Sequence, residues 1–175
     1  MVLVPGLIAF LLFILFDLNK IHWQWKPANS FFALGGLLLI ASTVLCITKS
    51  GLSGFTWSMG TILGLIACLA SAVLLVYALF FALPFQDTYA ESHEVPVVST
   101  GLYGLCRHPA FWPMLALYLF LWLTFGGPWL LAAAILYPLC NFLYIYIQDR
   151  WIFPLYIRGY DQYKQNVPFL IPRRK

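Results

Sequence analysis

The sequence predicts an all-α polytopic membrane protein with about five transmembrane helices. Hydrophobic residues make up 62% of the 175 residues, charged residues make up 9%, and the mean hydropathy is +0.85. Ordinary soluble domains carry roughly 25% charged residues, so this composition excludes that class. No linker, repeat or low-complexity segment divides the chain, and we therefore expect a single membrane domain over residues 1–175.

Five apolar runs account for the predicted transmembrane helices. They cover residues 2–16, 30–47, 55–83, 111–125 and 129–147. A helix needs about 20 apolar residues to cross a bilayer, so the first and fourth runs are slightly short. The third run would extend roughly 43 Å at about 1.5 Å per residue, so it must tilt or leave the bilayer with its last turns. We expect three N-terminal spans within residues 1–84.

The fourth and fifth runs are predicted to form a tight helical hairpin over residues 111–147. Only Gly126, Gly127 and Pro128 join the two runs. Glycine tolerates the unusual backbone angles of a short turn, and proline is favoured in the first turn of a helix. These three residues therefore predict two neighbouring antiparallel helices.

The basic residues predict the orientation of the chain in the membrane. With five spans and the N-terminus outside, nine of the ten Lys and Arg residues lie on the cytoplasmic side and only Lys49 lies outside. The nine are Lys20, Lys26, Arg107, Arg150, Arg158, Lys164, Arg173, Arg174 and Lys175. Lys and Arg accumulate in cytoplasmic loops, so we expect a cytoplasmic C-terminus. The net charge of +4 then indicates attraction to lipid headgroups and not to nucleic acid.

A predicted cytoplasmic loop over residues 85–110 contains a candidate site for an anionic ligand. Pro109 favours a helix start, which places Arg107 and His108 at a helix N-terminus. Free N–H groups and the helix dipole attract carboxylates and phosphates there, and the guanidinium adds a bidentate donor. The alternative is structural, because arginine at a helix end often reaches lipid headgroups and histidine often packs at an interface.

A second cytoplasmic segment, residues 148–175, carries a predicted stripe of polar aromatic residues. Asp149, Tyr156, Tyr160 and Tyr163 are spaced by seven, four and three residues, which places them on one stripe if the segment is largely helical. Aromatic faces near a carboxylate can hold a cation. An amphipathic helix resting on the membrane surface is the alternative interpretation. Pro154 should kink or restart this helix just past Phe153.

The two segments together resemble a known family. Gly101, Tyr103, Arg107, His108, Pro109 and Phe111 match the pattern G-x-Y-x-x-x-R-H-P-x-aromatic. Gln148 and Asp149, then Tyr160 and Tyr163, and the ending VPFLIP at residues 167–172 follow in order. This arrangement resembles the isoprenylcysteine carboxyl methyltransferase and phospholipid N-methyltransferase superfamily of integral membrane methyltransferases. The resemblance covers residues 95–172, with Gln148 and Asp149 where the family usually has two glutamates.

The resemblance implies S-adenosylmethionine as cofactor, in a cytoplasmic pocket built from the loop before the fourth helix and the C-terminal segment. It implies catalytic roles for Arg107 and Asp149, with Asp149 accepting hydrogen bonds that orient the cofactor. The cofactor-binding residues that it implies are Val97, Val98, Gly101, Tyr103, His108, Gln148, Asp149, Tyr160 and Tyr163. A lipophilic small-molecule or lipidated acceptor is expected from the bilayer: an isoprenylcysteine carboxylate, a phospholipid amine or a small thiol.

Two other function classes stay open beside the methyltransferase. One is a membrane reductase related to the sterol reductases, although no G-x-G-x-x-G nicotinamide fingerprint is present. The other is a catalytically inactive membrane scaffold of the same fold. The four cysteines occur singly without histidine at ligand spacing, so we expect no metal. Cys106, which precedes Arg107, is a candidate for a thiol with a low pKa.

Overall fold

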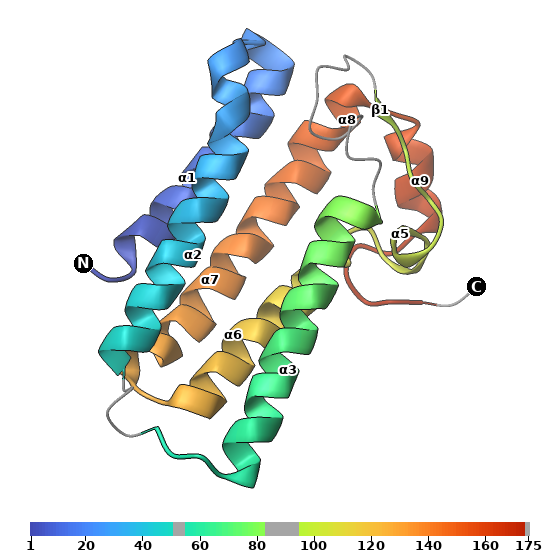
Figure 1. Cartoon of the computed structure of the whole chain (residues 1–175). Helices are drawn as coiled ribbons and strands as arrows, with labels where there is room; N and C mark the ends of the chain where they lie inside the picture. The colour runs from blue at the N-terminus through green and yellow to red at the C-terminus, as the bar shows by residue number, and fades with distance from the viewer. Residues whose placement is uncertain (51–54, 83–94, 174–175) are drawn as a thin grey trace.

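The computed structural model describes residues 1–50, 55–82 and 95–173, which are mostly helical as predicted for an all-α protein (Figure 1). Four helices are long and apolar enough to cross a membrane. They cover Val4–Trp23, Lys26–Ser50, Met59–Phe81 and Pro128–Tyr156. A further apolar helix has only 15 residues, Phe111–Phe125, and rises about 22 Å, which is less than the hydrocarbon thickness of about 30 Å.

The long helices form one bundle with alternating directions (Figure 1). Its members are α1 (Val4–Leu18), α2 (Phe31–Ser50), α3 (Met59–Val76), α6 (Phe111–Phe125) and α7 (Pro128–Ile147). Helix α1 packs along α2, and α3 packs along α6. Helix α7 contacts α1, α2 and α6, so it joins the two pairs. The C-terminal ends of α1, α3 and α7 lie at the same end of the bundle (Figure 1).

The third helix is shorter than its apolar run. It begins at Met59 because Ser58 caps it: the Ser58 hydroxyl accepts from the backbone N–H of Thr61, and the Thr61 hydroxyl accepts from the backbone of Ser58. With the π-helical turn Tyr77–Phe81 it contains 23 residues and extends about 35 Å. The excess over the bilayer thickness is therefore smaller than the sequence predicts.

The predicted hairpin between α6 and α7 is confirmed. Gly126 and Gly127 have φ values of 69° and 82°, and Pro128 is the first residue of α7. A Cβ on Gly127 would lie 2.5 Å from the backbone oxygen of Ser50 at the end of α2. The Ser50 hydroxyl also accepts from the backbone N–H of Leu130 at 3.0 Å. Glycine at position 127 thus lets the hairpin turn contact the end of α2 directly.

Hydrogen bonds between helices stabilise the apolar bundle. The hydroxyl of Tyr137 on α7, which is fully buried, lies 2.5 Å from the Ser42 hydroxyl on α2. The hydroxyl of Tyr118 on α6 lies 2.7 Å from that of Thr43. Polar pairs of this kind hold membrane helices together, typically by about 0.6 kcal/mol each. Helix α2 is thereby linked to both helices of the hairpin.

A small polar cap covers the end of the bundle where α1, α3 and α7 finish. It consists of β1 (Val95–Pro96), α5 (Leu102–Leu105), α8 (Phe153–Tyr156), β2 (Ile157–Arg158) and α9 (Tyr160–Asn166). Strands β1 and β2 pair in parallel, which joins the loop before α6 to the C-terminal segment. Of the predicted loop 85–110, residues 85–94 lie outside the described residues.

The predicted tyrosine stripe on one helix is wrong. Helix α7 ends in a π-helical turn, Gln148–Ile152, and the chain restarts as α8 with Pro154 in its first turn, as predicted. Strand β2 then separates α8 from α9. Gly159, with φ 80°, begins α9 in a left-handed conformation that favours glycine. Tyr156 therefore lies on α8, whereas Tyr160 and Tyr163 lie together on α9.

Candidate functional site

The loop that carries Arg107 and His108 is held by the C-terminal ending of the chain. The backbone N–H of Arg107 donates to the Pro168 carbonyl at 2.9 Å, and the backbone N–H of Arg173 donates to the Leu105 carbonyl at 3.1 Å. The indole of Trp112 donates to the Leu170 carbonyl at 2.8 Å. Residues from both predicted segments are thus fixed against each other by backbone contacts.

Arg107 and His108 precede α6 rather than forming its first turn. Helix α6 begins at Phe111, with Ala110 as its cap, so Pro109 lies in the turn before it. The His108 ring is buried against two phenylalanine rings, stacked on Phe153 at 5.8 Å and edge-on to Phe169 at 5.1 Å. Burial lowers the pKa of His108, and the hydrogen bond to Asp149 opposes this shift. His108 is therefore neutral at pH 7, and its neighbour Arg107 carries the positive charge.

Asp149 is the centre of the polar contacts in the cap. Its Oδ1 lies 2.9 Å from the Nε of Arg107 and accepts from the Tyr160 hydroxyl at 2.6 Å. Its Oδ2 accepts from Nη2 of Arg107 at 3.2 Å. The Nε2 of His108 lies 3.4 Å from Oδ1, and the Lys164 ammonium lies 3.9 Å from Oδ2. These partners come from two segments of the chain, and the positive charges of Arg107 and Lys164 balance one buried carboxylate.

Two of the tyrosines predicted from the C-terminal segment, Tyr160 and Tyr163, are buried and protonated. Burial raises the pKa of Tyr160, and the adjacent Asp149 carboxylate raises it further. Burial also raises the pKa of Tyr163, whose hydroxyl donates to the Tyr103 carbonyl at 2.6 Å. Both hydroxyls are therefore hydrogen-bond donors within the cap, and neither is poised to lose its proton.

A cavity of about 170 Å³ lies between the cap and the ends of the bundle helices. Eight of the ten predicted site residues line it: Val97, Val98, Tyr103, Arg107, His108, Gln148, Tyr160 and Tyr163. Asp149 is outside this lining and faces protein donors instead. Gly101 is also outside it and begins α5 with φ 60°, which indicates a role in the turn.

The adjacent residues Gln148 and Asp149 face different partners. Asp149 contacts the cap, whereas the Gln148 amide donates to the Asp17 carboxylate at 2.8 Å and to the Tyr144 hydroxyl at 2.7 Å. Both residues lie in the π-helical turn after α7 and both are buried. Such turns are frequent at functional sites. Here the turn directs one residue to the cavity and the next to the Arg107 guanidinium.

Sequence reasoning missed Asp17, which lines the cavity from α1 and is only 3% exposed. Asn141 and Tyr144 on α7 line it as well. A signal was available: Asp17 is the only charged residue among the first 19 residues of the chain. An acidic residue within an apolar helix is costly and usually functional, so the residue type alone could have identified it.

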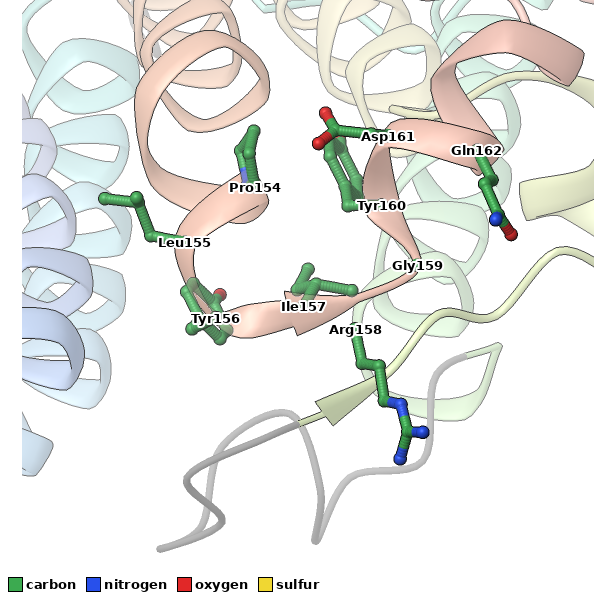
Figure 2. Close-up of a pocket in the computed structure, with 9 residues that line it drawn as sticks. All are labelled: Pro154, Leu155, Tyr156, Ile157, Arg158, Gly159, Tyr160, Asp161 and Gln162. Atoms are coloured by element: carbon green, nitrogen blue, oxygen red, sulfur yellow. The ribbon is translucent and has the colours of Figure 1, made fainter.

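A shallow outer groove of about 810 Å³ adjoins the cavity (Figure 2). It is lined by the consecutive residues from Pro154 to Gln162, where the chain turns back from α8 through β2 to α9. Figure 2 shows Pro154 and Tyr160 on the two sides of this turn. Tyr156, Ile157 and Tyr160 line both the groove and the inner cavity, so they form the wall between them.

The expected low-pKa thiol is contradicted. Cys106 is buried, and burial raises the pKa of its thiol. Within residues 1–50, 55–82 and 95–173, no three His, Cys, Asp or Glu side chains are grouped closely enough to hold a metal ion.

Comparison of the chain with protein-family models, with curated proteins and with solved structures found no match. The functional interpretation consequently depends on the geometry of the cavity and on the motifs in the sequence.

Proposed function

We propose that this chain is an integral membrane methyltransferase that uses S-adenosylmethionine to methylate a lipophilic or amphiphilic acceptor. One observation carries the proposal: the two motif-bearing segments meet at a single cavity at the end of apolar, membrane-length helices. A membrane scaffold has no need for a neutralised Arg107–Asp149 pair beside such a cavity. The resemblance to the isoprenylcysteine carboxyl methyltransferase and phospholipid N-methyltransferase superfamily supports the same function.

The groups around the cavity suit the charges of this cofactor. Arginine has five N–H donors, and the contacts of Arg107 with Asp149 and the Lys164 carbonyl occupy three at most. The remaining donors are available for a carboxylate, and the rings of Tyr160 and Tyr163 suit a cation. Bound S-adenosylmethionine supplies a methyl group on a sulfonium, which needs no covalent step from the protein.

The inner cavity is smaller than a ligand of cofactor size requires. Pockets for drug-sized ligands typically occupy about 300–1,000 Å³, and the inner cavity is about 170 Å³. A ligand of cofactor size would require displacement of the wall formed by Tyr156, Ile157 and Tyr160, beyond which the outer groove lies. The inner cavity alone suits one end of a ligand or a small acceptor headgroup.

The protein would promote methyl transfer by alignment and by excluding water. Arg107 and the tyrosines hold and orient the ligands, while Asp149 fixes the guanidinium and acts as a positioning residue. Phe16, Phe32 and Phe153 line the same cavity and reduce its water content. The acceptor classes are an isoprenylcysteine carboxylate, a phospholipid amine and a small thiol.

The proposed orientation places the cap and the C-terminus in the cytoplasm and the N-terminus outside, with five spans. The nine-to-one distribution of basic residues supports it. In a protein without its native cysteines, Asp161→Cys in the cap and Trp57→Cys before α3 report on opposite ends of the bundle. An impermeant thiol reagent added outside intact cells should label only the Trp57→Cys protein. Labelling of the Asp161→Cys protein alone would show that the orientation is the reverse of the one proposed.

Calorimetry of the detergent-purified protein tests the function itself. We expect S-adenosylmethionine to bind with micromolar affinity and a reduced nicotinamide cofactor to give no heat of binding. The reverse result would support the membrane reductase related to the sterol reductases. Absence of binding for both would support the inactive scaffold and contradict the methyltransferase.

A further inference from the structure

An amide side chain that the proposed function does not use lines the cavity from inside a membrane-length helix. Asn141 lies on α7, which runs between the other long helices of the bundle (Figure 1). Tyr144, Ile145 and Gln148 line the same cavity and follow Asn141 by three, four and seven residues. This spacing places all four on one face of the helix. At about 1.5 Å per residue, Asn141 lies about 10 Å farther from the cap than Gln148.

The two amides on this face differ in their hydrogen bonds. The Gln148 nitrogen donates to the Asp17 carboxylate at 2.8 Å and to the Tyr144 hydroxyl at 2.7 Å, so both of its N–H groups are used. Among the residues that the structure describes, none is hydrogen-bonded to the Asn141 amide. Neither the oxygen nor the nitrogen of this amide is fully enclosed by those residues. Asn141 therefore offers a ligand in the cavity one acceptor and two donors.

The position of Asn141 favours a neutral ligand group. A polar side chain inside a membrane helix is unfavourable without a hydrogen-bonding partner, so an open amide that lines a cavity there indicates contact with a ligand. A neutral amide cannot balance the charge of an ion, but it bonds well to an ester or to another amide.

The cap end of the same cavity has a different chemistry. Arg107 lines the cavity next to the cap and is hydrogen-bonded to the backbone of α9. Tyr160 and Tyr163 line it from α9 itself. An amphiphile with its headgroup at this end brings the first part of its apolar chain to Asn141, where the bundle helices are apolar. The group that joins headgroup and chain then lies within reach of the open amide.

We propose that Asn141 is a specificity-determining residue that binds the neutral linking group of an amphiphilic acceptor, an ester or an amide between its headgroup and its apolar chain. This role deepens the proposed function and rests on it, since only a methyltransferase has such an acceptor. A phospholipid amine carries esters at that point, and an isoprenylcysteine carries a peptide amide, whereas a small thiol carries neither. The first two acceptor classes are therefore favoured over the third.

Calorimetry with three uncharged probes of equal chain length, N-methyloctanamide, methyl octanoate and decane, tests the site without any methyl donor. The wild-type protein should bind the amide, the ester or both about tenfold more tightly than decane, as expected for one good hydrogen bond. Asn141→Leu, which is apolar and of similar size, should remove that preference, and Asn141→Gln should keep part of it. Asn166→Leu, at an exposed position of α9, is the matched control and should bind like the wild type.

The same measurements distinguish the two sources of the linking group. Tighter binding of N-methyloctanamide than of methyl octanoate assigns the site to an isoprenylcysteine amide, and the reverse order assigns it to a phospholipid ester. Equal affinity for these two probes, above that for decane, shows that the site accepts either group.

Equal binding of all three probes by the wild-type protein would overturn the proposal, even if the variants fail to fold. Loss of S-adenosylhomocysteine binding in Asn141→Leu, with the amide and ester probes unaffected, would overturn it as well, because Asn141 would then contact the methyl donor. Selective binding of the amide or ester probe by a protein that does not bind S-adenosylmethionine would contradict the proposed function alone.

Discussion

Two buried aspartates at the same end of the bundle have different hydrogen-bond partners. Asp149 contacts the guanidinium of Arg107 at 2.9 Å and lies outside the cavity lining. Asp17 lines the cavity and is hydrogen-bonded to neutral groups, Gln148 and Tyr144. The comparison shows that two buried carboxylates at one end of the bundle are held by different partners, one by the cap and the other by α7.

The π-helical turn after α7 produces this separation. Gln148 and Asp149 are neighbours in sequence, yet the first reaches α1 and the second reaches the cap. The charge of Asp149 is balanced inside the protein, so its loss should mainly affect folding. Asp17 instead lines the cavity and accepts a hydrogen bond from the Gln148 amide, with Lys20 acting on it electrostatically.

The largest expected effect is on stability, from Asp149→Asn. Removing one partner of a buried ion pair leaves the Arg107 charge without its carboxylate and typically costs about 3–5 kcal/mol. Denaturant unfolding of the detergent-solubilised protein measures the loss. Asp161→Asn, at an exposed position of α9, is the control and should change the free energy of unfolding by less than about 0.5 kcal/mol. Equal effects at both positions would contradict the assigned role of Asp149.

Arg107→Lys should reduce ligand affinity by about 1–3 kcal/mol, because lysine keeps the charge but loses the planar fork of donors. Titration of wild type and variant with S-adenosylmethionine measures the difference. Arg150→Lys, at an exposed position on the same side of the molecule, should bind like the wild type. A lipid anchor would tolerate the change at position 107, so unchanged affinity would favour that alternative.

Removing the hydroxyls of Tyr160 and Tyr163 one at a time compares the stability contributed by a hydrogen bond to a charged carboxylate with that contributed by a bond to a neutral carbonyl. Tyr160→Phe removes a 2.6 Å hydrogen bond to the Asp149 carboxylate and should cost about 1.5–3 kcal/mol of unfolding free energy. Tyr163→Phe removes a 2.6 Å bond to the Tyr103 carbonyl and should cost about 0.5–1.5 kcal/mol. Thermal unfolding of both variants shows which one loses more stability. A larger loss of stability for Tyr163→Phe would contradict the central position of Asp149.

The smallest expected effect is a pH dependence of stability from His108. Its pKa is lowered in the folded protein by burial, whereas the unfolded chain takes up the proton near pH 6.5. The free energy of unfolding is therefore independent of this group above pH 6.5. It falls as the pH drops below that value, since the unfolded state then binds more protons than the folded state. Unfolding measured from pH 5 to pH 8 should show this decline, and His108→Gln should reduce the slope. An identical slope in both proteins would exclude His108 as its source.

Much of the fold follows from short-range features of the sequence. The apolar composition predicts membrane-length helices, Gly126 to Pro128 predict the hairpin, and Pro154 predicts the restart of the helix at α8. Each of these depends on a backbone preference or on bilayer thickness, so local sequence suffices. The sequence motifs around Arg107 and Asp149 also predicted candidate site residues, but they did not predict which of these side chains contact each other.

Tertiary structure alone decided which side chains meet. Asp17 and Gln148 are 131 residues apart, and their contact depends on how α1 packs against α7 and on the π-helical turn. The pairing of β1 with β2 breaks the predicted tyrosine stripe and still brings Tyr160 to Asp149. Periodicity describes neighbours along one helix, whereas these contacts join segments whose relative position is set by packing across the bundle.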